Sequence, residues 1–135
     1  MSEDPGLGTV TELNAENFEP LLRTAKGMVV MEFYSPNCPV CQMISPIIEA
    51  MAKDMQGQVY FSRLNTDDYP EISVRLDVVA TPTFIFFCGG RPVGAWVGFV
   101  SEIAMRDTIE DLNQHKDICI QTSTPLPSRI LDAHG

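Results

Sequence analysis

Apolar and polar positions alternate along several short stretches of the chain, and this pattern predicts the strands of a sheet. Residues 28–34 carry apolar side chains on both faces of the alternation, which is typical of a central strand covered by helices on both sides. Residues 59–65 predict a second strand, parallel to the first. Residues 83–87 and 93–97, joined by Gly89-Gly90, predict a β-hairpin.

Helices are predicted between these strands from capping residues and from apolar positions at helical spacing. The first is expected to run from Asn14, its N-cap, to about Lys26, with a kink at Pro20. The second begins at Cys38 and contains Pro46, which is expected to bend it. The other expected elements are a strand over residues 9–11, a short helix over 70–76, and a last helix from Ser101 to about Lys116 that turns Ile103, Met105, Ile109 and Leu112 toward the core.

A βαβ half followed by a hairpin and a helix predicts an α/β protein with three layers, α/β/α, around a central mixed sheet. The length of 135 residues suits one domain, which we place at residues 9–116. Residues 1–8 are expected to form a flexible leader. Residues 117–135 are rich in proline and polar side chains, and we expect a mobile C-terminal tail.

Charge and composition narrow the choice of partners. The net charge of −9 opposes binding to nucleic acid or to an anionic membrane, so neither is expected as a partner. The chain starts with acidic and polar residues rather than with a basic segment and an apolar run, and its longest apolar stretches are too short to span a bilayer. We therefore expect a soluble, cytoplasmic monomer.

The candidate chemistry lies in the segment Cys38-Pro39-Val40-Cys41, at a strand-to-helix junction. This spacing places two sulfurs one helical turn apart, close enough to form a disulfide. It also places Cys38 at a helix N-terminus, where free N–H groups and the helix dipole favour the reactive thiolate. Cys38 is expected to attack a partner disulfide, and Cys41 to resolve the mixed disulfide.

The two residues between the cysteines suggest a hypothesis about thiol acidity. If Cys38 is the N-cap, Pro39 is the first helical residue, where its missing N–H is not needed. The N–H groups of Val40 and Cys41 then remain available to the Cys38 sulfur. We therefore expect Cys38 to be more acidic, and the pair more oxidising, than in a protein of the same fold with a Cys-Gly-Pro-Cys segment.

A metal site is the main alternative for the cysteine pair. Structural zinc needs four ligands, whereas Cys88 and Cys119 each occur singly in the sequence and both histidines, His115 and His134, lie late in the chain. We therefore predict no metal. A dimer that binds a metal or a cluster through Cys38 of two chains, and a binding module without turnover, remain alternatives.

Several separate segments, in the same order, resemble the thioredoxin family from about Thr9 to Lys116. They are the strand Met28–Phe33, the loop Tyr34–Cys41, Pro46, the segments Leu64-Asn65-Thr66-Asp67 and Ala80-Thr81-Pro82-Thr83, and Gly90 and Gly98. The resemblance implies a thioredoxin fold and a thiol–disulfide oxidoreductase. It also implies a redox-active Cys38–Cys41 disulfide with no bound cofactor, client proteins with disulfides, and an upstream reductase that the sequence does not identify.

The resemblance also assigns roles to individual residues. Thr81-Pro82 matches the family's cis-proline loop, which faces the sulfurs and binds peptide; a trans bond is the alternative. Glu32 matches a buried acid that is usually Asp, so it is a candidate proton acceptor for Cys41; the alternative is a glutamate that reaches solvent. The expected substrate-binding residues are Thr81, Pro82, Tyr34, Asn37, Pro39 and Val40.

Three positions depart from the family pattern beside the cysteines. Asn37 and Tyr34 stand where tryptophan is usual, and Gln42 stands where lysine is common. These departures concern the choice of partner rather than the fold. The sequence therefore predicts a reductase in cell redox homeostasis, with a redox relay of restricted partner and little general reductase activity as the alternative.

Overall fold

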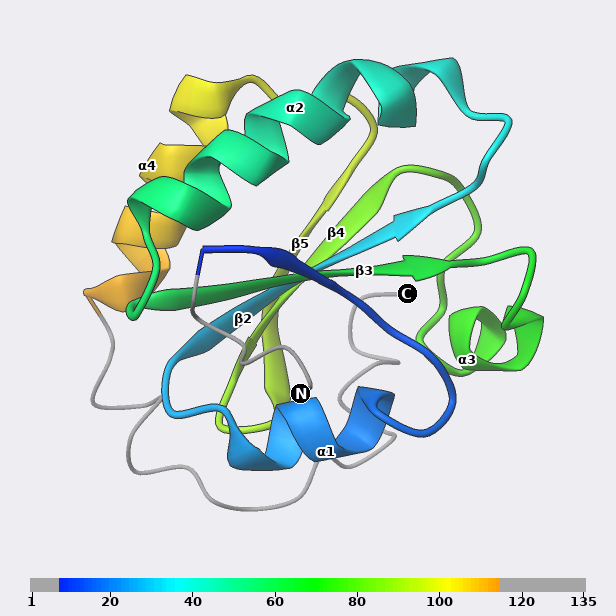
Figure 1. Ribbon diagram of the computed structural model, residues 1–135, viewed down its shortest axis with the longest axis horizontal. Helices are drawn as coiled ribbons and strands as arrows, with labels where there is room; N and C mark the ends of the chain where they lie inside the picture. Colours follow the sequence, from blue (N-terminus) through cyan, green and yellow to red (C-terminus); the bar gives the residue numbers. More distant parts are fainter. Residues whose placement is uncertain (1–7, 115–135) are drawn as a thin grey trace.

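A mixed five-stranded sheet organises the chain in the computed structural model, which describes residues 8–114 (Figure 1). Its strands are β1 (Val10–Glu12), β2 (Met28–Tyr34), β3 (Val59–Asn65), β4 (Thr83–Cys88) and β5 (Arg91–Val97), in the spatial order β1-β3-β2-β4-β5. β3 runs parallel to both β1 and β2, whereas β4 is antiparallel to β2 and β5. β2 is the central strand, as its two apolar faces predicted.

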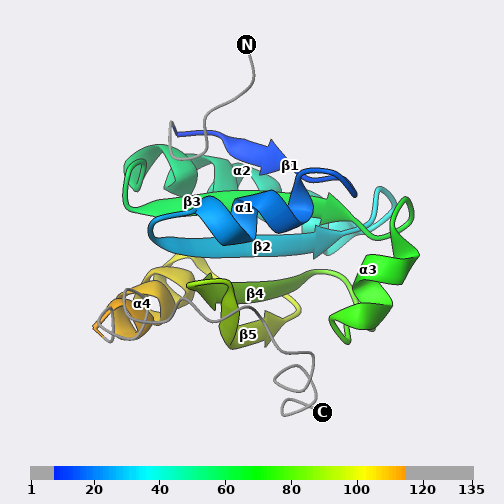
Figure 2. The same cartoon turned by 90° about the horizontal axis from the view of Figure 1, so that it is seen from below.

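Four helices cover the two faces of the sheet: α1 (Phe18–Thr24), α2 (Pro39–Asp54), α3 (Pro70–Arg75) and α4 (Glu102–Asn113). α2 and α4 lie on one face, and α1 and α3 lie on the other (Figures 1 and 2). Alternate residues of β2 join two separate cores, since Val29 and Met31 pack with α1 and α3, and Met28 and Val30 pack with α2 and α4. The predicted α/β/α layering is confirmed.

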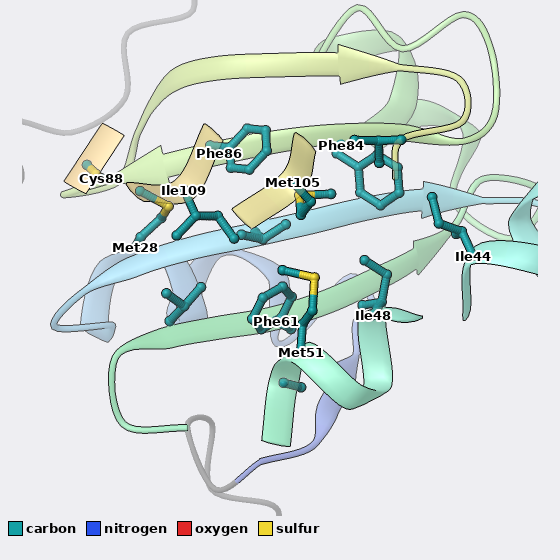
Figure 3. Packing of buried hydrophobic residues seen from close by; sticks show 14 residues of the cluster. Met28, Ile44, Ile48, Met51, Phe61, Phe84, Phe86, Cys88, Met105 and Ile109 are labelled. Atoms are coloured by element: carbon teal, nitrogen blue, oxygen red, sulfur yellow. The ribbon is translucent and has the colours of Figure 1, made fainter. Parts of the chain in front are cut away.

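The core under α2 and α4 is built from aliphatic, aromatic and sulfur-containing side chains (Figure 3). Ile44, Ile48 and Met51 project from α2 toward the sheet, and Met105 and Ile109 project from α4. All five are almost fully buried. This packing fixes the long helix α2 on the sheet and therefore fixes the cysteine pair that begins it.

The first helix differs from its prediction. Asn14 does not cap a helix: its side-chain oxygen accepts hydrogen bonds from the N–H groups of Glu16 and Asn17, both at 2.8 Å, and this forms a turn. The helix begins only at Phe18, so Pro20 lies in its first turn, where no intrahelical N–H bond is required. The predicted kink at Pro20 is therefore wrong.

The last helix begins where the sequence predicted. Ser101 is the N-cap, and its hydroxyl oxygen accepts a hydrogen bond from the Ala104 N–H at 3.1 Å. Met105 and Ile109 are buried, but Ile103 is 73% exposed, so its predicted place in the core is wrong. Ile103 precedes Met105 by two residues, which is about 200° around a helix, and so faces the opposite side.

Some predictions fall on residues that the structure does not describe. The leader, apart from Gly8, and the tail lie outside residues 8–114, as do Cys119, both histidines and Lys116, the expected end of the last helix. Across the residues that it does describe, no helix is both long and apolar enough to cross a membrane.

Candidate active site

The ends of two neighbouring strands bring the cysteine loop and the proline loop together. Phe33 of β2 lies opposite Thr83 of β4, and the two strands are antiparallel. The chain therefore leaves β2 toward Cys38 at the same end of the sheet at which it enters β4 from Pro82. The N–H and the hydroxyl of Thr66 both donate to the Tyr34 carbonyl, at 2.8 and 3.2 Å, and attach the start of the cysteine loop to the end of β3.

Cys38 and Cys41 form a disulfide at the N-terminus of α2, with their Cα atoms 5.2 Å apart. Cys38 is the N-cap and Pro39 the first helical residue, as predicted. The Cys41 N–H donates to the Cys38 Sγ at 3.1 Å, whereas the Val40 N–H makes no such bond within the described part of the chain. Cys38 is 8% exposed and Cys41 2%, so Cys38 is the more accessible sulfur-bearing residue.

The Thr81–Pro82 peptide bond is cis, so the trans alternative is wrong. The loop is held on both sides: the Thr83 hydroxyl donates to the Ala80 carbonyl at 2.7 Å, and the Gly98 N–H donates to the Pro82 carbonyl at 2.8 Å. Pro82 itself is buried, and Thr81 is half-buried.

An open groove of about 330 Å³ runs between the cysteine loop, the end of β3 and the proline loop. Its lining is formed by Ser35, Thr66, Asp67, Val78, Val79, Ala80 and Thr81. Thr81 is the predicted binding residue among them. The others were not predicted to bind substrate, although Thr66, Asp67 and Ala80 lie in segments that carried the family resemblance. Ser35, Thr66 and Asp67 directly follow β2 and β3, and this position at strand ends is the signal that could have identified those three.

Glu32 lies inside the protein, 1% exposed, so the alternative of a glutamate reaching solvent is wrong. Its place in the alternation of β2 puts it on the same face as Val30, the face that α2 covers. Burial raises the pKa of the Glu32 carboxyl to about 7; Arg63 opposes this rise and Glu12 adds to it. Among residues 8–114, no group forms a hydrogen bond with either carboxyl oxygen.

The remaining predicted binding residues have different surroundings. The Tyr34 hydroxyl donates to Glu12 at 2.6 Å, so its polar end contacts β1 rather than the groove. Asn37 and Pro39 are exposed and Val40 is half-buried beside the cysteines. All three are accessible to a partner approaching Cys38, but no interaction in the structure assigns them a binding role.

Sequence reasoning missed two charged residues near Glu32. Arg63 of β3 lies beside Glu32, and Glu12 of β1 lies beside Arg63. Arg63 follows Phe61 by two residues and therefore shares its buried face, a pattern that could have pointed to a charge near the buried acid. Glu12 ends a three-residue strand, too short for its alternation to be informative.

Comparison with known proteins identifies the family. The family model described as thioredoxin matches residues 9–111. The chain belongs to the thioredoxin family. Thioredoxins are disulfide oxidoreductases that use an intrinsic disulfide, and the Cys38–Cys41 pair fits this type of site.

Individual thioredoxins resemble parts or most of the chain. "Thioredoxin M4, chloroplastic" of Arabidopsis thaliana is 38% identical over 82 residues, which cover 61% of this chain and 42% of that protein. A "Bifunctional thioredoxin reductase/thioredoxin" of Mycobacterium leprae is 28% identical over 112 residues, 83% of this chain and 24% of that protein. The chain spans about half the length of the plant thioredoxins that it matches.

A solved thioredoxin has the same fold. The structure of a mutant thioredoxin from Halobacterium salinarum superposes with a TM-score of 0.72 at 23% identity, covering 82% of this chain and 95% of that one. Among residues 8–114, no three His, Cys, Asp or Glu side chains are grouped so that they could hold a metal ion.

Proposed function

We propose that the chain reduces protein disulfides by exchange with its Cys38–Cys41 pair. One observation carries the proposal: the pair begins the long helix α2, with the Cys41 N–H donating to the Cys38 sulfur, beside the loop of cis-Pro82. A helix N-terminus favours a thiolate, and an accessible thiolate attacks disulfides. The groove lined by residues from Ser35 to Thr81 lies beside this loop, and we propose that an extended client segment binds there.

The exchange balances as two successive substitutions at sulfur. The Cys38 thiolate attacks one sulfur of the client disulfide, the client S–S bond breaks, and one client thiolate leaves and takes a proton from water. The Cys41 thiol then loses its proton, and the resulting thiolate attacks the Cys38 sulfur. The mixed disulfide breaks, the second client thiolate leaves, and the Cys38–Cys41 disulfide forms. The client gains two electrons and the cysteine pair loses two.

Glu32 is the proposed acceptor of the Cys41 proton. It lies on the face of the sheet that α2 covers, and Cys41 belongs to the first turn of that helix. A carboxyl with a pKa of about 7 holds or releases a proton near neutral pH, which suits a general acid–base. The proton can pass from the Cys41 thiol to the Glu32 carboxylate directly or through one water molecule.

An upstream reductase must return two electrons to the disulfide. The Mycobacterium leprae relative is named as a bifunctional thioredoxin reductase/thioredoxin, which supports a thioredoxin reductase as the donor. We further propose that the chain works as a monomer in a reducing compartment, the cytoplasm that the sequence suggested, where it contributes to redox homeostasis.

A cysteine trap tests the proposal. Without the Cys41 thiol, the Cys41→Ser variant should retain a model protein substrate as a mixed disulfide on Cys38, seen as a mass increase that dithiothreitol removes. Cys38→Ser is the matched control, since it keeps one buried thiol but loses the attacking one. The wild type should reduce the same substrate catalytically. Absence of both the trapped species and the catalysis would reject the proposal. Trapping of one partner without reduction of other disulfides would favour the restricted relay.

A further inference from the structure

Three charged residues form one row across the sheet. Arg63 of β3 lies opposite Glu12 of β1 on one side and opposite Glu32 of β2 on the other. Residues in register on neighbouring strands point to the same face. Two residues before each member of the row, Phe61 and Val30 belong to the core under α2 and Val10 packs against it. The arginine therefore stands between two carboxyl groups, one at the sheet edge and one in the interior.

We propose that Glu12 is a positioning residue that engages Arg63 and so limits how strongly this arginine stabilises the charged form of Glu32. The inference rests on the proposed function in one respect: that function makes Glu32 the acceptor of the Cys41 proton. The arrangement of charges itself does not depend on that role.

Arg63 is held on the side of Glu12 by several contacts. Its Nε lies 3.9 Å from the Glu12 Oε1, and its guanidinium lies over the Tyr34 ring, 4.7 Å from the centroid. The Tyr34 hydroxyl donates to the other Glu12 oxygen at 2.6 Å, and one terminal nitrogen of Arg63 donates to Ser45 of α2 at 3.4 Å. These contacts fix the guanidinium between Glu12, an aromatic ring and the helix that carries the cysteines.

Glu32 receives no comparable contact from Arg63. Neither oxygen of Glu32 accepts a hydrogen bond from any residue between 8 and 114, and the Arg63 Nε is also without one. The arginine thus acts on Glu32 through its field and not through a formed ion pair. The electrostatic effect of Arg63 on Glu32 becomes weaker when a nearby negative charge compensates the charge of the guanidinium. Along the row, Glu12 is the negative charge on the other side of Arg63.

Each strand or helix that packs around Glu32 contributes identifiable neighbours, some charged and some uncharged. β3 contributes Arg63, β1 contributes Glu12, and β4 contributes the apolar Phe84 opposite Glu32. α2 contributes the cysteine pair and the exposed Glu49, and β2 itself contributes Tyr34. Burial is the largest influence on the pKa of Glu32; Arg63 lowers it and Glu12 raises it. The two members of the row therefore oppose each other.

The consequence is a connection between the surface and the interior. The Glu12 side chain is 55% exposed, whereas that of Arg63 is 21% exposed and Glu32 is buried. A change of charge at the exposed end should reach the buried acid through Arg63. Removing the Glu12 charge should let Arg63 favour the Glu32 carboxylate, so the acid should release its proton at lower pH.

Carbon-13 NMR of side-chain carboxyl groups, recorded on the oxidised protein, tests this inference. In Glu12→Gln, the titration midpoint of Glu32 should fall by about one pH unit. Glu16→Gln is the matched control, because Glu16 is exposed, forms no ion pair in the described residues and loses the same charge. Arg63→Met should raise the midpoint. Glu12→Ala should lower the Glu32 midpoint by a similar amount, which would show that the amide of glutamine is not the cause of the change.

A double substitution separates the two possible routes. In the Arg63→Met background, Glu12→Gln should move the Glu32 midpoint by less than half as much as in the wild type. An equal effect in both backgrounds would mean direct repulsion between the carboxylates and would overturn the positioning role. An unchanged midpoint in Glu12→Gln and Glu12→Ala would overturn it as well. Because the oxidised protein performs no exchange, these results are independent of the reductase assay and its outcome.

Discussion

At the scale of single residues, the proposed chemistry depends on two groups: the Cys38 sulfur and the Glu32 carboxyl. A backbone N–H acts on the Cys38 sulfur, and burial and neighbouring charges act on the Glu32 carboxyl. Within residues 8–114, neither group makes a large set of hydrogen bonds to side chains. The Cys38 sulfur accepts from the Cys41 N–H, and the carboxyl is buried beside a charged row. Substitutions that change only these surroundings should therefore change reactivity without changing the fold.

The order of the residues between the cysteines should set the acidity of Cys38. In a Pro39→Gly, Val40→Pro variant, proline occupies the second helical position and removes the N–H of residue 40. We expect that N–H to act as a second donor, beside the Cys41 N–H, to the Cys38 thiolate of the reduced wild type. A hydrogen bond to a charged group is worth about 1.5–3 kcal/mol, so the thiol midpoint should rise by about one pH unit in the variant. Thiolate absorbance near 240 nm, or the rate of alkylation against pH, measures it. A Cys38 midpoint no lower in the wild type than in the variant would contradict the hypothesis.

Replacement of Glu32 by Gln should slow the resolving step and leave the first attack unchanged. Glutamine keeps the size of the side chain but cannot accept the Cys41 proton as a base. Resolution should be slower by about 10²-fold near neutral pH, the lower end of the range for general base catalysis. Rapid-quench analysis of a mixed disulfide on Cys38 separates the two steps. Resolution with an identical rate at every pH would remove Glu32 from the mechanism.

At the scale of helices and strands, the sequence predicted the centre of the fold better than its margins. The bounds of β2 and β3 match their predictions, because both strands are rich in apolar and aromatic residues and are bounded by glycine or polar residues. The start of α1 was misplaced, since Asn14 suits a helix cap and a turn equally well. The turn forms because Asn17, three residues later, donates its N–H to the Asn14 side chain.

The candidate site shows the same division. The cysteine pair could be predicted from the local sequence at a strand-to-helix junction, whereas the proline loop and the buried acid were implied by the resemblance to the thioredoxin family. The groove and the row of Glu12, Arg63 and Glu32 were missed, because the sequence holds only partial signals for them and does not specify the strand register that brings these residues together. Long-range pairing therefore supplied the residues that were missed.

The N-cap of α4 offers a prediction for a whole element. Ser101→Ala removes the acceptor for the Ala104 N–H and should lower the free energy of unfolding by about 1 kcal/mol. Urea denaturation of the oxidised protein measures the change. Ile103→Ala, two positions further along the chain, should cost less than about 0.5 kcal/mol because Ile103 is exposed. A loss above about 2 kcal/mol in Ile103→Ala would instead place its side chain in the core.

At the scale of the whole molecule, the buried acid links folding to pH. The pKa of Glu32 is about 7 in the folded protein and 4.5 in the unfolded chain, so the folded state binds the extra proton between these values. Its contribution to stability is therefore complete below pH 4.5 and is lost as the pH rises through 7. The difference of about 2.5 pH units corresponds to roughly 3 kcal/mol. Above neutral pH, the buried carboxylate therefore lowers the free energy of unfolding.

Glu32→Gln should therefore make the protein more stable than the wild type at pH 8 by roughly 3 kcal/mol, and the advantage should vanish near pH 4. Denaturant unfolding of the two oxidised proteins at several pH values measures the difference between their free energies of unfolding. The contributions of all other titrating groups cancel in this difference. Glu16→Gln is the control for the loss of one carboxyl, and it should change the free energy of unfolding by less than about 0.5 kcal/mol because Glu16 is exposed. If the advantage of Glu32→Gln were the same at pH 4 and pH 8, the carboxyl would be titrating normally in the folded protein. The proton-acceptor role proposed for Glu32 would then lose its physical basis, whereas the cysteine chemistry proposed for the start of α2 would stand unchanged.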